Sequence, residues 1–321
     1  PRMMGMTFGR RFQEWIKTSR PNLLGNWRRW ILISAIAMTV ALSGLVVAGV
    51  NLGIEFAGGR LFEISTTNEV DIDELRTTLA EGGLPRASIQ ESGAGNLIIR
   101  TGELSPEEEE FVLGAVSDVG GEIEVERDQF VGPTLGDELR NKALIALGIA
   151  LLVQLIYLAF RFRWTFALSS VLAMTHDVAI LIGLFAWLGK TFDGVFLASL
   201  LTVIGYSVND SVVIFDRIRE QMKLRPDDPV EEVANDACLQ TVPRTINTGL
   251  GAMLILISLY FLGGDTLADF ALALLIGILV GTYSSVFTAS PLAIFFEERY
   301  PRPPPEPEPK TPVGRSRNAR R

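Results

Sequence analysis

One stretch decides how this chain must fold: residues 205–220 read GYSVNDSVVIFDRIRE. Together with the residues before it, its first half is an apolar run long enough to cross a bilayer, yet it contains a bare carboxylate, Asp210. A charge within the hydrocarbon costs at least about 2.5 kcal/mol, so it is retained mainly where it has a partner or a task. Asp210 is therefore the leading candidate for a functional residue.

The rest of the composition fits a membrane protein. The 321 residues are 48% hydrophobic, with a mean hydropathy of +0.29. Almost uncharged blocks of the length that crosses about 30 Å of hydrocarbon alternate with segments of ordinary soluble composition. The blocks predict six membrane spans, at residues 30–50, 141–160, 164–188, 195–215, 244–262 and 270–293. We therefore predict a polytopic α-helical membrane protein with six transmembrane helices.

Loop charges predict the sidedness. Arg and Lys gather in the arm 1–29, after the second span, after the fourth span and in the Pro-rich tail 294–321, which we expect to be disordered. With six spans these segments share one side, which the positive-inside rule makes cytoplasmic. Both termini are then cytoplasmic, the five spans of 141–293 form a bundle, and the acidic segment 51–140 lies on the far, periplasmic side. A cleaved signal peptide is the alternative for the first span, but its apolar core is too long and its basic arm too extended.

Several classes of function are disfavoured. The net charge is −8, and the basic segments lie where topology signals belong rather than in a stripe that could bind nucleic acid. Cys238 is the only cysteine and His176 the only histidine, which excludes an intrachain disulfide and a His-rich metal site built by this chain alone. The sequence contains no phosphate-binding P-loop and cannot assemble a catalytic triad. We expect no enzymatic activity and no cofactor, and a transmembrane proton gradient as the energy source.

The external segment predicts a small α+β domain. Residues 60–131 follow a βαββαβ order, with strands at 61–65, 87–91, 96–101 and 122–129. Its first helix occupies 71–80, where Asp71 and Glu74 have capping-box spacing, and the second begins at Ser105, an N-cap followed by proline. This order is typical of the ferredoxin-like arrangement, an antiparallel sheet with helices on one side.

Asp210 has neighbours and a candidate partner. Ser207, Asp210 and Ser211 lie at i, i+3 and i+4, so they share a helix face that must point into the protein. At about 1.5 Å per residue, Arg244 on the fifth span lies at a depth comparable to Asp210 on the fourth. Burial favours the protonated acid and a guanidinium favours the carboxylate, and this competition suits a proton relay. A static ion pair that only fixes helix packing fits the residues equally well, and the sequence leaves both open.

Two further features of the spans carry weaker signals. His176 and Asp177 are adjacent halfway along the third span. His176 could take part in a secondary proton relay, but we favour a hydrogen-bonded pair that stabilises the bundle. The role of Asp177 stays open. Gly277 and Gly281 form a small-xxx-small motif, which is typical of close helix contact.

Four motifs together resemble the SecD/SecF family of bacterial protein-export membrane subunits, and its SecF branch in particular. They are GYSVND at 205–210 followed by FDRIRE at 215–220, GIEFAGG at 53–59, GTYSS at 281–285, and the pair His176-Asp177. The second motif, at the exit of the first span, contains Gly53, Glu55, Gly58 and Gly59. The resemblance extends over nearly the whole chain.

The resemblance implies a function. Members pair with SecD in a pseudo-symmetric twelve-span unit related to the RND superfamily of transporters, beside the SecYEG channel in the inner membrane. That unit uses the proton-motive force to promote export of a translocating polypeptide. The family's proton path carries over to Asp210 and Arg244, with Asn209, Ser207 and Ser211 around them and a further carboxylate from SecD. Glu55 departs from the usual Asp of its motif, and Ser211 replaces a common Thr but keeps the hydroxyl.

Two other functions remain as rivals. Half of an RND-type proton-coupled exporter of small molecules or lipids would share the topology, but it favours a single chain with two repeats and larger external domains. A membrane scaffold without transport predicts that Asp210→Asn leaves export intact. We expect SecD, SecYEG, the translocating polypeptide and membrane lipid as partners, and no nucleic acid.

Overall fold

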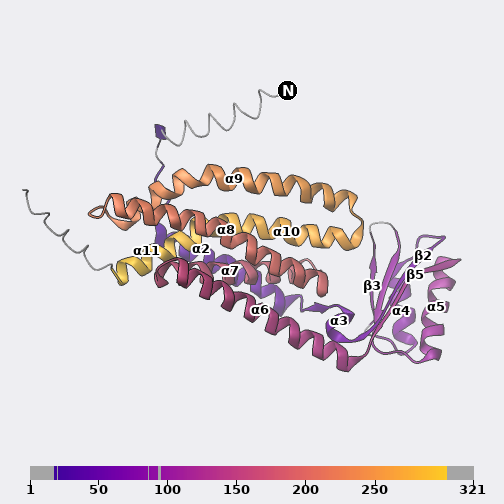
Figure 1. The fold of residues 1–321 in the computed structure, drawn as a ribbon. Helices are drawn as coiled ribbons and strands as arrows, with labels where there is room; N and C mark the ends of the chain where they lie inside the picture. Colours follow the sequence, from indigo (N-terminus) through magenta and orange to yellow (C-terminus); the bar gives the residue numbers. More distant parts are fainter. Residues whose placement is uncertain (1–17, 20, 86, 93–94, 302–321) are drawn as a thin grey trace, which may run out of the picture.

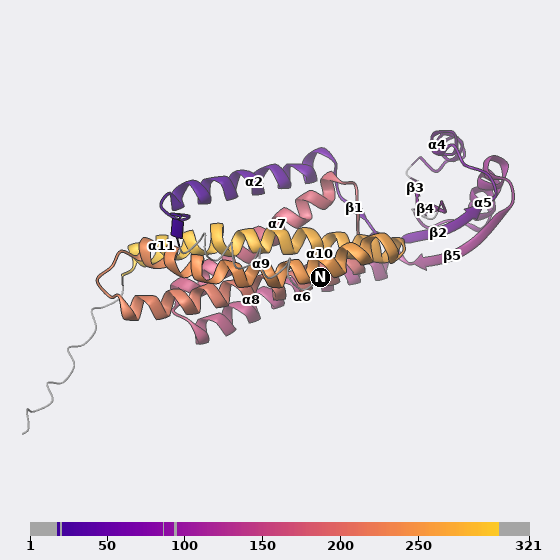
Figure 2. The same cartoon turned by 90° about the horizontal axis from the view of Figure 1, so that it is seen from above.

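The computed structural model describes residues 18–301 except 20, 86 and 93–94. Most of the basic arm and the tail expected to be disordered lie outside the described residues. A long helical bundle has a small α/β domain at one end and helix α11 at the other (Figure 1). In the perpendicular view helix α2 runs along the outside of this bundle (Figure 2).

The bundle confirms the predicted fold class. Among the described residues, six helical segments are long and apolar enough to cross a membrane. They are α2 (Trp27–Val47), α6 (Pro133–Arg161), α7 (Trp164–Trp187), α8 (Gly194–Leu224), α9 (Val230–Leu262) and a composite last span. The last span consists of α10 (Asp265–Ser284), a π-helical turn η1 (Ser285–Ala289) and α11 (Ser290–Arg299).

Three helices extend furthest beyond the spans predicted from hydropathy. Helix α6 begins at Pro133, inside the segment assigned to the external domain, α8 continues to Leu224, and α9 begins at Val230. The first turns of α6 are charged but pair internally, with Arg140 on Asp137 at 2.9 Å and Lys142 on Glu138 at 2.7 Å. Such i,i+3 and i,i+4 pairs support a helix in water. Hydropathy detects only the apolar part of these helices, so α6 and α9 begin before the membrane spans predicted from 141 and 244.

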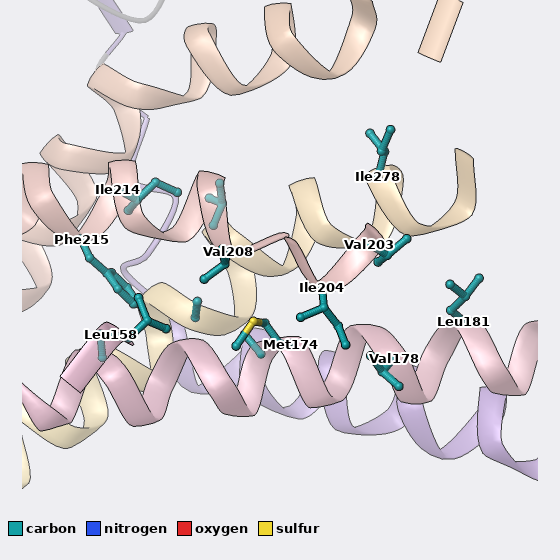
Figure 3. Close-up of a cluster of buried hydrophobic side chains, with 14 of the residues drawn as sticks. Leu158, Met174, Val178, Leu181, Val203, Ile204, Val208, Ile214, Phe215 and Ile278 are labelled. Atoms are coloured by element: carbon teal, nitrogen blue, oxygen red, sulfur yellow. The ribbon is translucent and has the colours of Figure 1, made fainter. Parts of the chain in front are cut away.

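Helices α7, α8 and α10 form the centre of the bundle. Of the most apolar stretch in each helix, 61% is buried in α7 but only 6% in α6. An apolar seam joins the central helices (Figure 3), built from Met174 and Val178 on α7, Val203, Ile204 and Val208 on α8, and Ile278 on α10. Large apolar side chains of α2, α6 and α9 are exposed instead. This division is expected of helices that face lipid or another membrane chain.

The external domain has the predicted ferredoxin-like topology. Its elements are β2 (Gly59–Thr66), α4 (Ile72–Glu81), β3 (Ser88–Glu91), β4 (Leu97–Thr101), α5 (Pro106–Gly120) and β5 (Ile123–Val131). The antiparallel strand order is β3-β4-β2-β5. Asp71 caps α4, and Ser105 with Glu108 forms a capping box on α5. Phe62 and Ile64 point into the core beneath the two helices, so alternate residues of β2 face the opposite way, towards the bundle.

A compact junction ties this domain to the bundle. Strand β1 (Asn51–Leu52) pairs in parallel with β6 (Thr191–Phe192), and the short helix α3 (Ile54–Ala57) packs on α6. Gly58 and Gly59 then turn the chain into β2 with φ values of +73° and +121°. A Cβ on Gly59 would lie 2.1 Å from the carbonyl oxygen of Thr101. Glycine is required at 59 because both the backbone conformation and the space exclude a side chain.

We expect Gly59→Ala to lower the melting temperature of the detergent-solubilised chain, because the strained backbone alone costs about 1–3 kcal/mol and the contact with Thr101 adds to it. Gly102→Ala is the matched control, since a Cβ there meets no atom within 4 Å. Equal melting temperatures for the two variants would contradict this account of the junction.

Candidate functional site

A buried carboxylate joins three helices at the centre of the bundle. Asp177 on α7 has a relative exposure of 1%. Its Oδ2 accepts a hydrogen bond from Ser207 Oγ of α8 at 2.6 Å and another from Ser284 Oγ of α10 at 2.7 Å. Both donors are buried with it, and buried polar groups need such partners. Asp177, whose role the sequence left open, is the polar centre of the bundle.

His176 supports the same group. Its Nδ1 lies 3.0 Å from Asp177 Oδ1, as expected for the hydrogen-bonded pair predicted from the sequence. The other ring nitrogen, Nε2, is buried and has no hydrogen-bond partner in the described part of the protein. One carboxylate is thus held by groups from all three central helices.

Asp210 lies one helical turn beyond Ser207 in a different environment. It is buried, but its Oδ2 has no hydrogen-bond partner among the described residues. The same is true of Ser211 Oγ, Tyr206 Oη and Thr282 Oγ1 nearby on α8 and α10. Buried polar atoms nearly always have partners, so such a cluster is exceptional.

The structure divides the predicted relay residues. Ser207 donates its hydrogen bond to Asp177 rather than to Asp210, although Ser207 and Asp210 were predicted to act together. Asn209 is exposed, because it follows Ser207 by two residues and the helix turns it away from the shared face. Ser211 and Asp210 remain together on the buried side. The relay itself stays a prediction.

Arg244 on α9 is exposed and makes no ion pair in the described part of the chain, so the predicted direct pair with Asp210 is not formed. Its charge nevertheless acts on the Asp210 carboxylate electrostatically. The depth estimate from helix rise was insufficient, since it ignores the rotation of α9, which directs Thr245 inward and Arg244 outward.

Small residues let the central helices approach. A Cβ on Gly277 would lie 2.1 Å from Val203 Cγ2, and one on Gly281 would lie 3.3 Å from Ser207 Cβ. Helix α10 therefore contacts α8 through the predicted small-xxx-small motif, and this contact brings Ser284 within reach of Asp177.

Ser284 was missed as a site residue. Its signal was the GTYSS motif at 281–285, which entered the sequence interpretation only as part of the family resemblance. Directly after it the helix widens into the π-turn η1, a feature that is frequent at functional sites. Within and beside this turn, Ser34 of α2 contacts Thr288 at 2.7 Å and Tyr283 at 3.2 Å.

A second group of charges lies in a cleft of about 790 Å³ between the sheet and the outer end of the bundle. Arg100 of β4 faces Glu55 of α3 and Asp193, the N-cap of α8. Burial raises the pKa of Asp193, and burial lowers the pKa of Arg100 while the charge of Asp193 opposes that change. Gly53 accommodates this arrangement, since a Cβ there would lie 2.6 Å from Glu55 Oε2 and 2.8 Å from Asp193 Cβ.

Comparisons with known proteins identify the family. Residues 112–299 match the model of "Protein export membrane protein SecD/SecF, C-terminal", and residues 43–70 match that of the "SecD/SecF GG Motif", which here contains Gly58 and Gly59. The chain therefore belongs to the SecD/SecF family of protein export membrane proteins.

Individual relatives place it near the SecF subunits. It is 38% identical to protein translocase subunit SecF of Magnetococcus marinus, with 89% of this chain and 94% of that protein covered. The SecF of Pseudomonas aeruginosa is 36% identical, with coverages of 87% and 92%. These relatives have the names of translocase subunits rather than of enzymes.

A longer relative has a solved structure. The crystal structure of SecDF from Thermus thermophilus, described as a translocon-associated membrane protein, superposes with a TM-score of 0.80 at 37% identity. The alignment covers 87% of this chain but 39% of that one, so this chain corresponds to about two fifths of SecDF.

We expect Asp177→Ala to lower the melting temperature clearly, because the buried Ser207 hydroxyl loses its acceptor at about 1–3 kcal/mol and Ser284 keeps only the Gly281 carbonyl. Asp177→Asn keeps one acceptor oxygen and should lose less. The control is Asp216→Ala, which removes a largely exposed ion pair with Arg161 and should cost at most about 1 kcal/mol. If Asp177→Ala melted like the control, Asp177 would not hold the three helices together.

Proposed function

We propose that this chain is a SecF-type subunit of the Sec protein translocase which, together with SecD, uses the proton-motive force to promote polypeptide export across the inner membrane. One observation carries the proposal: Asp210 is buried in the membrane bundle with a carboxylate oxygen that has no partner among the described residues. An intramembrane acid of this kind is typical of proton pathways. The names of the SecF and SecDF relatives support the export role.

The two buried acids have different tasks in this proposal. Asp177 accepts hydrogen bonds from two serine hydroxyls and faces His176, so it is satisfied within the chain and serves as a fixed anchor. Asp210 has an open oxygen and senses the charge of Arg244. Proton exchange therefore takes place on Asp210. A carboxylate or water from the SecD side, together with Ser211, completes its surroundings.

Protonation would change the packing of the helices that carry these groups. A neutral Asp210 attracts Arg244 less, so α9 and its exposed guanidinium gain freedom relative to α8. Deprotonation restores the attraction. Two arrangements of α8 and α9, each favoured by one protonation state, provide the two-state element that ion coupling requires.

A continuous connection leads from these helices to the external domain. Asp193 caps α8 by accepting a hydrogen bond from the Phe196 amide at 2.8 Å. The preceding residues form β6, which pairs with β1 at the entrance of the domain, and the amide of Gly53 donates to the Phe192 carbonyl at 2.9 Å. A movement of the outer end of α8 is therefore transmitted to the external domain, which would engage the translocating polypeptide.

The arrangement of basic residues supports a cytoplasmic position for both termini. Arg161 pairs with Asp216, and Arg163 pairs with Glu297, so the connection between α6 and α7 meets α8 and α11 at the side opposite the external domain (Figure 1). The positive-inside rule assigns that side to the cytoplasm. The external domain is then periplasmic, next to the SecYEG channel. The coupling needs a proton gradient and no cofactor.

The exposed apolar faces of α2, α6 and α9 support a partnership within the membrane. The longer Thermus relative is named SecDF, and this chain covers 40% of it. We propose that SecD supplies the remaining membrane helices as a separate chain.

We expect Asp210→Asn to abolish the part of precursor export that depends on the proton-motive force, because the amide cannot exchange a proton. Export is measured as the amount of precursor that becomes protected from added protease inside inverted vesicles, with and without an uncoupler. The control is Glu138→Gln on α6, which is exposed and remote from the bundle centre, and should export normally.

The Asp210→Asn variant must be present at normal protein levels and copurify with SecD. These two measurements show that a loss of export does not result from misfolding or failed assembly. The uncoupler should not lower export further in the Asp210→Asn variant. If it lowers export as much as in the unchanged chain, Asp210 is excluded as the coupling group. That result would favour the interpretation as a static scaffold.

A further inference from the structure

A crevice unrelated to the buried acids lies at the end of the bundle opposite the external domain. It has a volume of about 440 Å³ and is formed where the start of α2 faces α11. Trp27, Ile31 and Phe295 give it an apolar wall, and Arg28, Arg299 and Glu298 stand around it. It is an open, amphipathic crevice beside the first turn of α2, the first candidate membrane span.

The walls of the crevice are fixed by contacts outside it. Asn235 of α9 accepts hydrogen bonds from the amides of Leu23 at 2.7 Å and Leu24 at 3.1 Å, which sets where α2 begins. The indole of Trp30 donates to the Leu23 carbonyl at 2.7 Å and its ring lies 4.2 Å from that of Phe287.

The apolar wall itself is also packed. Trp27 is buried, and its ring centroid lies 6.1 Å from that of Phe295. The guanidinium carbon of Arg28 stands 5.2 Å from the centroid of the Trp27 ring. The crevice is therefore formed before any ligand arrives, which lowers the cost of binding.

The charges around the crevice are unbalanced. Arg28 and Arg299 are exposed, and neither forms an ion pair with any residue that the structure describes. Glu298 is the one acidic residue of the lining, and the first turn of α2 contains none. The side chains thus offer two guanidinium groups beside an apolar surface, at a membrane interface marked by two tryptophans.

A guanidinium pair beside a hydrocarbon wall fits one class of ligand. Arginine binds phosphate oxygens in a bidentate manner, and an acyl chain would lie along Ile31 and Phe295. A zwitterionic lipid also has a phosphate, but its choline or amine would meet the same two positive charges. An anionic headgroup has no such conflict.

We propose that the crevice between α2 and α11 is a binding site for an anionic phospholipid, with the headgroup phosphate held by Arg28 and Arg299 and one acyl chain lying against Ile31 and Phe295. The bound lipid would fasten the first span to the last at the cytoplasmic surface. The proposal does not depend on proton coupling, because it rests on other residues at another end of the molecule.

The test is a native mass spectrometry titration of the full chain in detergent. The probes are dioleoylphosphatidylglycerol, dioleoylphosphatidylcholine, which has the same acyl chains, and inorganic phosphate. We expect saturable binding of one phosphatidylglycerol, markedly weaker binding of phosphatidylcholine and none of phosphate. Arg28→Gln together with Arg299→Gln should weaken phosphatidylglycerol binding about 30-fold, since each arginine near a lipid surface contributes about fivefold.

Two single variants separate a site from general attraction. Arg29→Gln removes a neighbouring exposed charge that does not line the crevice, so binding should change less than with Arg28→Gln. Glu298→Gln should tighten phosphatidylglycerol binding by removing the one opposing charge. Melting temperatures without added lipid show whether each variant is folded.

Equal losses with Arg28→Gln and Arg29→Gln would overturn the proposal, because they would show diffuse attraction to a basic surface. Equal affinity for the two lipids would overturn it as well. Binding of inorganic phosphate as tight as that of the lipid would identify a free anion as the ligand and remove the acyl chain from the site.

Discussion

The carboxylate of Asp177 is the interaction on which the bundle depends. It receives hydrogen bonds from serines of α8 and α10 at 2.6 and 2.7 Å while it lies on α7 at 1% exposure. A buried carboxyl group without such partners is costly within a membrane. Since the donors come from two other helices, these hydrogen bonds form only when the three helices are assembled. The bundle and its polar centre therefore require each other.

Close approach of the helices makes this centre possible. Lipid tails are as apolar as leucine, so apolar side chains alone give membrane helices little reason to associate. Gly277 and Gly281 let α10 come against Val203 and Ser207 of α8, close enough for hydroxyl groups to reach Asp177. The apolar seam around this contact then excludes lipid and fixes the register (Figure 3).

Two aspartates thus have different chemistry because of their neighbours. Asp177 is satisfied within the chain, whereas Asp210 has an oxygen without a partner and a guanidinium that acts from a distance. The direct ion pair with Arg244 expected from the sequence is not formed. In the proposed function this difference is useful, because a carboxylate locked in a short ion pair could not exchange protons readily. The partner of Asp210 is then expected outside this chain.

The sequence by itself determined the six spans, the ferredoxin-like domain and the presence of two acids within apolar helices, because these follow from local periodicity, hydropathy and capping residues. Only the tertiary structure decided that Ser207 and Ser284 donate hydrogen bonds to Asp177, that Asn209 and Arg244 face outward, and that charged turns continue the helices beyond the predicted apolar spans. Helix rise fixes depth, but the rotation of each helix and the identity of its neighbours depend on packing between segments far apart in sequence. A one-dimensional pattern therefore shows which residues must be buried and leaves open which residues they meet.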